Sequence, residues 1–101
     1  MPKQLTKLHL ISDSFDIIHL NKQYSRYVED GEQLLFIGES VINLLDKQII
    51  DRLSELDNKY YALKADCKCR GISELLPAEV EQVTDIKMVE LTLNNHKTIS
   101  W

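Results

Sequence analysis

The chain has 101 residues, a hydrophobic content of 44% and a formal net charge of −4 at pH 7. These values predict one globular domain over residues 1–101 with a single hydrophobic core. The negative charge disfavours direct binding of nucleic acid, which needs clustered lysine and arginine. Apolar runs in the sequence are far shorter than the ~20 residues that cross a bilayer, so we expect no membrane contact.

The N-terminal stretch and the cysteine content predict a cytoplasmic protein. Residues 1–14 carry two lysines, but Asp13 cuts the apolar part short, which is not the pattern of a secretory signal. The two cysteines, Cys67 and Cys69, are too few and too close in sequence for a disulfide framework. Free thiols in a reducing compartment are therefore expected.

Apolar runs alternate with helical patterns in the first part of the chain. Residues 8–11 are apolar on both sides of the strand alternation and residues 34–37 are continuously apolar, which is typical of strands covered on both faces. Residues 12–14 are preferred helix caps, so a helix is predicted to begin near Phe15. Its apolar positions recur at helical spacing and predict one buried stripe. They are Ile17, Leu20, Tyr24, Tyr27 and Val28.

A long helix is predicted after the second strand, with Ser40 as its cap. Its apolar residues follow at intervals of four, four, four and three. They are Val41, Leu45, Ile49, Leu53 and Leu56. A third strand is predicted from Tyr60 to Leu63, and Asp66 is expected to cap one or two helical turns that end at Gly71.

The last third of the chain predicts a strand, a helix and an edge strand. Pro77 excludes a central strand over residues 73–79, and a weaker strand follows over 80–83. Thr84 or Asp85 is expected to cap the next helix, and residues 98–101 form a short edge strand. The apolar positions of that helix are Ile86, Val89 and Leu93.

This alternation predicts an α/β fold. Strands that alternate with helices form βαβ units with right-handed crossovers. The expected architecture is a three-layer α/β/α domain with a small, mainly parallel sheet of four or five strands.

Acidic residues follow several strands, among them Asp13, Glu39, Asp66 and Asp85. Ligands gather at the carboxyl ends of parallel strands, and carboxylates there could hold Mg²⁺. An acid-lined, metal-dependent module is therefore one hypothesis, although helix capping explains such residues better.

No cofactor or metal is expected. The glycines are single and far apart, so the backbone cradle that binds nucleotide phosphates is missing from the sequence. His9, His19 and His96 have no spacing that suggests zinc. We expect His9, which lies on a buried strand, to be a hydrogen-bonded core residue.

Cys67 and Cys69 are the candidates for thiol chemistry. Three cations lie within residues 64–70, and nearby cations favour the thiolate. A nucleophilic or persulfide-carrying cysteine is thus physically possible. Against it, Asp66 opposes the cations, and residues two apart on a helix point to nearly opposite sides.

The ordered set of pieces, with the length, resembles the TusB/DsrH family of sulfur-relay proteins over nearly the whole chain. The pieces are Leu8-His9, Gly31-Glu32 before Leu34-Leu35, the strand Tyr61-Ala62-Leu63 with Asp66 and Arg70-Gly71 behind it, and Trp101 as the final residue. The resemblance implies a single domain with the DsrEFH-like fold. It also implies TusC-like and TusD-like homologous subunits as partners, in a heterohexamer made of two heterotrimers. Such a complex passes on persulfide sulfur for 2-thiolation of the wobble uridine of tRNA.

The resemblance also implies which residues lack a catalytic role. In the catalytic sister subunit the sulfur-accepting cysteine sits where the third strand ends, which here falls near Leu63. DsrH of sulfur oxidisers carries a cysteine in the first helix, and the region around Tyr24 has none. Cys67 and Cys69 lie further along the chain than the end of the third strand near Leu63. A non-catalytic, structural subunit is therefore expected, and not an enzyme.

The alternative function is a thiol sulfurtransferase that acts through Cys69 or Cys67.

For a structural subunit, the aromatic candidates for an interface are Trp101, Tyr60 and Tyr61, because aromatic residues often anchor interfaces. The two tyrosines can equally pack beneath helices on opposite faces of the sheet, which leaves Trp101 as the better candidate.

Overall fold

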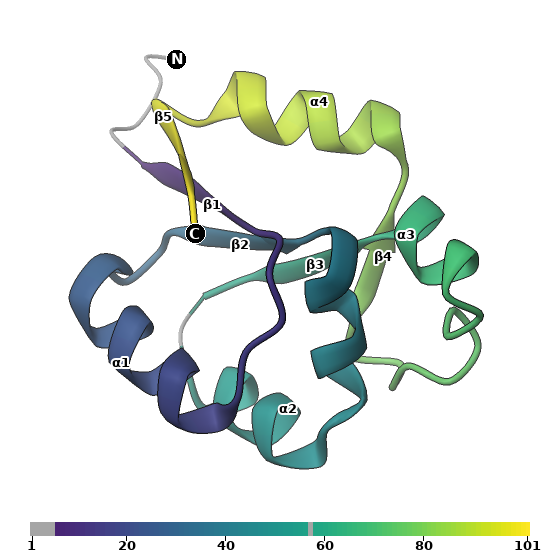
Figure 1. The fold of residues 1–101 in the computed structure, drawn as a ribbon. Coiled ribbons are helices and arrows are strands. Elements are labelled where there is room, and N and C mark those ends of the chain that lie inside the picture. Colours follow the sequence, from purple (N-terminus) through teal and green to yellow (C-terminus); the bar gives the residue numbers. More distant parts are fainter. Residues whose placement is uncertain (1–5, 57) are drawn as a thin grey trace.

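A sheet of five parallel strands forms the centre of the computed structural model, which describes residues 6–56 and 58–101 (Figure 1). The strands are β1 (Lys7–Ile11), β2 (Gln33–Phe36), β3 (Tyr60–Leu63), β4 (Glu81–Val83) and β5 (Lys97–Ser100), in the order β4-β3-β2-β1-β5. Each lies within one residue of its predicted limits. The prediction that the N-terminal stretch is not a secretory signal rests partly on residues 1–5, which lie outside the described residues.

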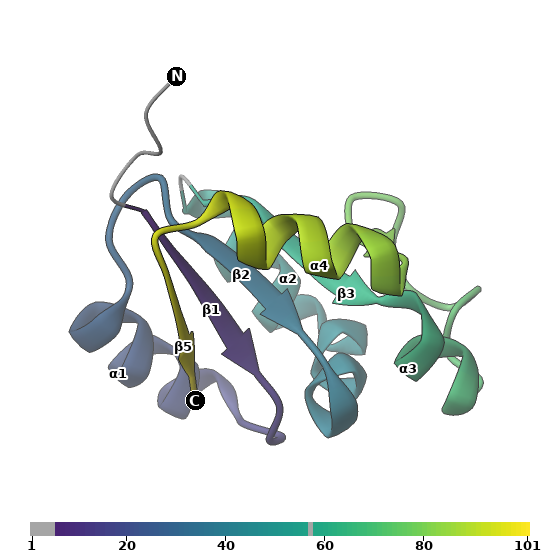
Figure 2. The ribbon, with the colours of Figure 1, turned by 90° about the horizontal axis from the view of Figure 1, so that it is seen from above.

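Helices cover both faces of the sheet, but unequally (Figures 1 and 2). One face carries α1 (Ile17–Tyr27), the 3-10 helix η1 (Gly38–Leu45) and α2 (Lys47–Glu55). The other face carries α4 (Asp85–Asn94), while α3 (Lys64–Cys69) lies at the carboxyl end of β3. The predicted three-layer α/β/α fold is confirmed. None of the described helices is long and apolar enough to cross a membrane.

Two apolar clusters fill the space between the layers. The larger one joins alternate residues of the central strands, such as Leu34 and Phe36, to the side of the molecule that carries α1 and α2. The smaller one lies on the opposite face of the sheet. It consists of Leu8, Leu35, Tyr61, Val83 and Leu91. Because both faces are covered, the central strands present apolar residues to both of them, as their sequence predicted.

The first helix begins later than its predicted caps at residues 12–14. Its N-cap is Asp16, whose side chain accepts a hydrogen bond from the backbone N–H of His19 at 2.7 Å. Asn43 holds the residue before it, accepting from the Phe15 N–H at 3.1 Å and donating to the Phe15 carbonyl at 2.6 Å. These bonds hold the link between β1 and α1 in place, so the helix starts only at Ile17, after its cap Asp16.

The predicted long second helix is two helices. Asp46 interrupts it with extended backbone and caps α2 by accepting a hydrogen bond from Gln48 N–H at 2.9 Å. The preceding turns are 3-10 helix, which has 3.0 residues per turn and therefore shifts the phase of the apolar stripe. As a result Leu44 is buried and Leu45, a predicted core position, is exposed.

α4 presents a different face to the core from the predicted one. Thr84 caps it by accepting a hydrogen bond from Lys87 N–H at 3.2 Å, which matches one of the two expected caps. Leu91 is buried against the sheet and Met88 packs beside it. The predicted apolar positions are instead solvent-exposed: Ile86, Val89 and Leu93. The helix has two apolar sides, and helical periodicity alone does not say which one faces the core.

Candidate functional site

β3 runs directly into α3 at the carboxyl edge of the sheet. Leu63, the last residue of β3, occupies the N-cap position of α3, is buried, and makes no side-chain capping bond. Asp66 does not cap α3 as predicted, because it lies in the first turn and accepts a hydrogen bond from the Gly38 backbone N–H at 2.8 Å. An apolar side chain therefore stands where the resemblance places the cysteine of a catalytic sister subunit.

The two cysteines of α3 lie in opposite environments. Cys67 is fully buried in the larger apolar cluster, whereas Cys69 is exposed. Burial raises the pKa of the Cys67 thiol, the Asp66 carboxylate raises it further, and the Arg70 guanidinium opposes them. Since the thiolate is the nucleophile, Cys67 is held in its less reactive form and away from a sulfur donor. Of the two thiols, only that of Cys69 is exposed to a reactant in solution.

The turn after β2 is tied to its surroundings by backbone and side-chain hydrogen bonds. Gly38 has φ +57°, where glycine is preferred, and a Cβ there would lie 3.4 Å from the Ser12 carbonyl oxygen. Ser40, predicted as a helix cap, is buried. Its hydroxyl lies 2.8 Å from the Ile37 carbonyl and also contacts that of Ile11. Ser40 therefore joins the ends of β1 and β2 instead of capping a helix.

The acidic residues that follow the strands make no metal cluster in the described part of the chain. Residues 6–56 and 58–101 contain no group of three or more His, Cys, Asp or Glu side chains that could hold a metal ion. The Asp66 carboxylate is engaged by the Gly38 N–H. The hypothesis of an acid-lined metal module gains no support from this arrangement.

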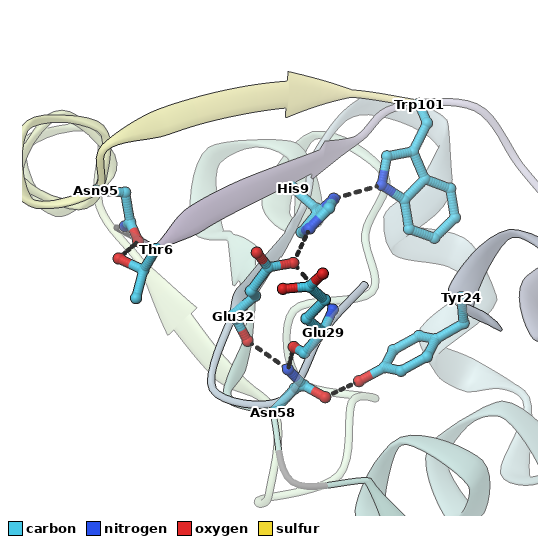
Figure 3. Close-up of polar contacts among 8 residues, drawn as sticks. All are labelled: Thr6, His9, Tyr24, Glu29, Glu32, Asn58, Asn95 and Trp101. Atoms are coloured by element: carbon cyan, nitrogen blue, oxygen red, sulfur yellow. Dashed lines mark hydrogen bonds and ion pairs between the residues drawn. The ribbon is translucent and has the colours of Figure 1, made fainter. Parts of the chain in front are cut away.

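A buried polar cluster forms around His9 on β1 (Figure 3). His9 is fully buried, and its Nε2 lies 2.8 Å from Glu32 Oε1, which is itself buried. The Trp101 indole N–H donates to His9 Nδ1 at 3.0 Å, and the two rings meet edge to face. The prediction of a hydrogen-bonded core histidine is confirmed, and both partners are far from it in sequence.

These contacts fix the tautomer of His9. An indole N–H can only donate, so Nδ1 must be the acceptor and carries no proton. The ring proton is then on Nε2 and is donated to the Glu32 carboxylate. Glu32 Oε1 also accepts from the Glu29 backbone N–H at 3.0 Å, so the buried carboxylate has two donors. The cluster is satisfied with a neutral imidazole.

Asn58 connects this cluster to α1 (Figure 3). Its Nδ2 donates to the carbonyl oxygens of Glu29 at 2.9 Å and Glu32 at 2.7 Å. Its Oδ1 accepts from the Tyr24 hydroxyl on α1. The loop that delivers Glu32 is thus held from two sides. His9 is buried and both its ring nitrogens are engaged, so the cluster joins β1 to the loop before β2 and to the residue after β5.

The three aromatic interface candidates occupy different surroundings. Tyr60 packs against the larger apolar cluster and Tyr61 lies in the smaller one, so they point to opposite faces, as strand alternation predicts. The Tyr61 hydroxyl accepts from Gln33 Nε2 at 3.2 Å. Trp101 is partly buried on the larger cluster, and its backbone N–H donates to the Leu10 carbonyl at 2.8 Å, which extends the β5–β1 pairing. An interface role for these residues stays a prediction.

Sequence reasoning missed Glu32 and Asn58 as members of the polar cluster. One signal was available, because a histidine on a buried strand needs partners. Glu32 directly precedes β2, which pairs with β1, so it was a candidate acceptor for His9. Asn58 gave no such signal, since its contacts depend on how the loops before β2 and β3 meet.

Comparisons with known proteins agree on one family. The family model described as "DsrH like protein" matches residues 19–98. The protein named Protein TusB from Pectobacterium atrosepticum is 30% identical over 77 residues, which cover 75% of this chain and 81% of that protein. Protein TusB from Photorhabdus laumondii subsp. laumondii is 26% identical over 78 residues, covering 76% and 82%.

A solved structure shares the fold. The crystal structure of the ychN protein from E. coli superposes with a TM-score of 0.71 and covers 95% of this chain and 99% of that chain. Its sequence identity is 17%, so this similarity concerns the fold alone. The family match, by contrast, spans most of the sequence, from α1 to within β5. The chain belongs to the family of DsrH-like proteins.

Proposed function

We propose that the chain is a non-catalytic subunit of a sulfur-relay complex required for 2-thiolation of the wobble uridine of tRNA. Membership of the DsrH-like family and two relatives named TusB support the relay role. The observation that carries the non-catalytic assignment is the end of β3. There Leu63 is an apolar residue, and the nearest thiol beyond it, Cys67, is buried.

The proposed partners are TusC-like and TusD-like homologous subunits, in a cytoplasmic heterohexamer of two heterotrimers. In this assembly the persulfide is carried by the sister subunit whose third strand ends in a cysteine. The present chain contributes shape and contact surface instead of a nucleophile. A polar cluster that pins β1, β2 and the residue after β5 suits a rigid structural subunit.

The decisive experiment removes both thiols from the chain. The double variant Cys67→Ala/Cys69→Ser is expressed in a strain that lacks this protein, and 2-thiouridine in purified tRNA is measured by mass spectrometry. We expect thiolation at the wild-type level. Lost thiolation in a variant that still co-purifies with its partners would overturn the non-catalytic role.

A second candidate function rests on the exposure of Cys69 next to Lys68 and Arg70. In a thiol sulfurtransferase, the Cys69 thiolate would attack the terminal sulfur of a donor persulfide, form a new S–S bond and release the donor thiol. Incubation with a persulfide donor would then add the mass of one sulfur atom to Cys69. Cys69→Ser alone would also abolish tRNA thiolation, an outcome that the structural role does not allow.

Assembly is tested separately from chemistry. The chain is co-expressed with its TusC-like and TusD-like partners, and the products are separated by size-exclusion chromatography with light scattering. Co-elution in a complex larger than a single subunit is expected. A chain that stays monomeric beside both folded partners contradicts the proposed function.

A further inference from the structure

α4 is apolar on two opposite sides. Its inner side packs Leu91 and Met88 against the sheet. Its outer side carries three aliphatic residues at intervals of three and four, which places them on one stripe. Their exposed fractions are 75% for Ile86, 52% for Val89 and 67% for Leu93. A helix with apolar residues on opposite sides is normally covered on both.

The face of the sheet under α4 is also the less covered one. α4 crosses it obliquely and leaves the carboxyl halves of β1 and β5 open in Figure 2. Leu10 and Ile37 belong to this face, because they pack against the smaller cluster, and they are only partly buried. The opposite face, by contrast, is covered by α1, η1 and α2. The layer on this side of the molecule therefore consists of α4 alone and covers less of the sheet than the layer on the other side.

The charges beside the stripe indicate what kind of protein covers it. On the helix surface Asp85 lies next to Val89 at one edge, and Glu90 lies next to Ile86 at the other. Lys87 lies farther from the stripe and pairs with Glu90 at 3.7 Å. Both edges are therefore acidic.

A second copy of the chain fits this surface poorly. Two-fold pairing of α4 with its own copy, parallel or antiparallel, would set acidic edge against acidic edge. Each copy also carries a net charge of −4. Like charges placed opposite one another across an interface are unfavourable. The complementary partner is a different protein that has basic residues beside an apolar surface.

The size of the surface indicates a folded partner. A stable interface buries about 800 Å² on each side, and three side chains on one helix supply only part of that. The contact must therefore extend over neighbouring surface, such as that around Leu10 and Ile37, which a folded domain can cover.

We infer that the outer face of α4, formed by Ile86, Val89 and Leu93, is the surface on which a different, homologous subunit of the relay complex docks, through an apolar patch bordered by lysine or arginine. This inference rests on the proposed function, because it takes the partner to be a TusC-like or TusD-like subunit. It adds the location of the interface and the chemistry of the partner's surface.

The test compares two exposed apolar residues. Val89→Glu places a charge in the centre of the stripe, whereas Ile18→Glu places one on α1, where Ile18 is 76% exposed. Both variants should unfold at nearly the wild-type temperature, because neither side chain is in the core. Val89→Glu is expected to weaken binding to the co-expressed TusC-like and TusD-like subunits by about tenfold or more. Ile18→Glu should bind as the wild type does.

A charge reversal gives an independent measurement. Glu90→Lys removes one acidic edge of the stripe and should weaken the same binding, with a smaller salt dependence than the wild type shows. If Val89→Glu and Glu90→Lys both bind like the wild type, the inference is wrong while the proposed function stands. If the wild-type chain binds neither partner, the proposed function itself fails. If the isolated wild-type chain dimerises and Val89→Glu makes it monomeric, the surface binds a second copy and the inference is overturned.

Discussion

The polar cluster at His9 and the cysteine pair of α3 relate to the sequence in opposite ways. His9, Glu32 and Trp101 are spread over almost the whole chain and meet in one hydrogen-bonded cluster. Cys67 and Cys69 are two residues apart, yet one is buried and the other exposed. Reactive residues that are close in sequence can thus be separated by the fold, while distant ones are joined by it.

Geometry explains both cases. Parallel pairing places β1 between β2 and β5. His9 on β1 therefore receives one partner from each side, Glu32 from before β2 and Trp101 from after β5. In a helix, residues two apart point in nearly opposite directions, so α3 cannot bury both of its cysteines. The first arrangement favours a rigid scaffold, and the second prevents the two thiols from acting together.

The largest expected difference between the two thiols is their rate of alkylation. Cys69 should react with iodoacetamide at the rate of an open thiol, whereas Cys67 should react only when the structure opens. For a domain of ordinary stability, that slows Cys67 by about a thousandfold or more. Pulsed labelling followed by peptide mass spectrometry measures both rates. Equal rates would show that Cys67 is accessible in the native state.

Removal of Glu32 should have the largest effect on stability. Glu32→Ala leaves the buried His9 Nε2–H without its acceptor and also removes the acceptor of the Glu29 N–H. We expect a loss of about 2–4 kcal/mol in the free energy of unfolding, measured by urea denaturation. The matched control is Glu55→Ala, because Glu55 forms an exposed ion pair with Arg52. A Glu32→Ala protein as stable as that control would mean that the cluster contributes little.

The same substitution has a local readout. Trp101 is the only tryptophan of the chain, and its indole contacts His9. Loss of the carboxylate that orients His9 should therefore change the tryptophan emission of the folded protein. The Glu55→Ala control should leave this emission as it is in the wild type.

Much of the fold was predictable, because strand and helix patterns are local. All five strands were predicted within one residue. Short apolar stretches bounded by polar residues mark the three central strands, whereas β4 and β5 were recognised as a weaker strand and an edge strand from their place between turns and helices. The break of the second helix at Asp46 was not predicted. An aspartate inside a helical pattern reads equally well as a surface residue, and its role as a cap depends on the backbone conformation before it.

The candidate site was predictable only where a local rule applied. Helix geometry predicted that Cys67 and Cys69 would point apart, and the burial of His9 predicted that it would be hydrogen-bonded. The exposure of Val89 was not predictable, because α4 has an apolar residue on either side, and the choice between them is made by packing against the sheet.

Serine substitution should separate the two cysteines by stability. Cys67→Ser puts a hydroxyl in an apolar cluster and should lower the free energy of unfolding by about 1–3 kcal/mol. Cys69→Ser lies at the surface and should change it by less than about 0.5 kcal/mol. Urea titrations of both variants beside the wild type measure the difference. Equal effects would remove the structural distinction between the two positions.

The smallest expected effect is a pH dependence that comes from the Cys67 thiol. Its pKa is raised in the folded protein, mainly by burial. In the unfolded chain the thiol ionises near its ordinary value of about 8.5, so above this pH the unfolded state binds fewer protons than the folded state does. Stability from this group is therefore complete below that value and is lost as the pH rises through the raised pKa.

Cys67→Ala isolates this effect, because alanine has no proton to lose. Urea titrations between about pH 7 and pH 9.5 should show a shallower loss of stability in Cys67→Ala than in the wild type. The upper limit avoids Tyr61, whose hydroxyl pKa is also raised by burial and would add its own alkaline loss near and above pH 10. Cys69→Ser is the matched control and should keep the wild-type slope. If Cys67→Ala and the wild type lose stability in parallel, the thiol of Cys67 ionises as easily in the folded protein as in the unfolded chain, and its burial gives it no protection.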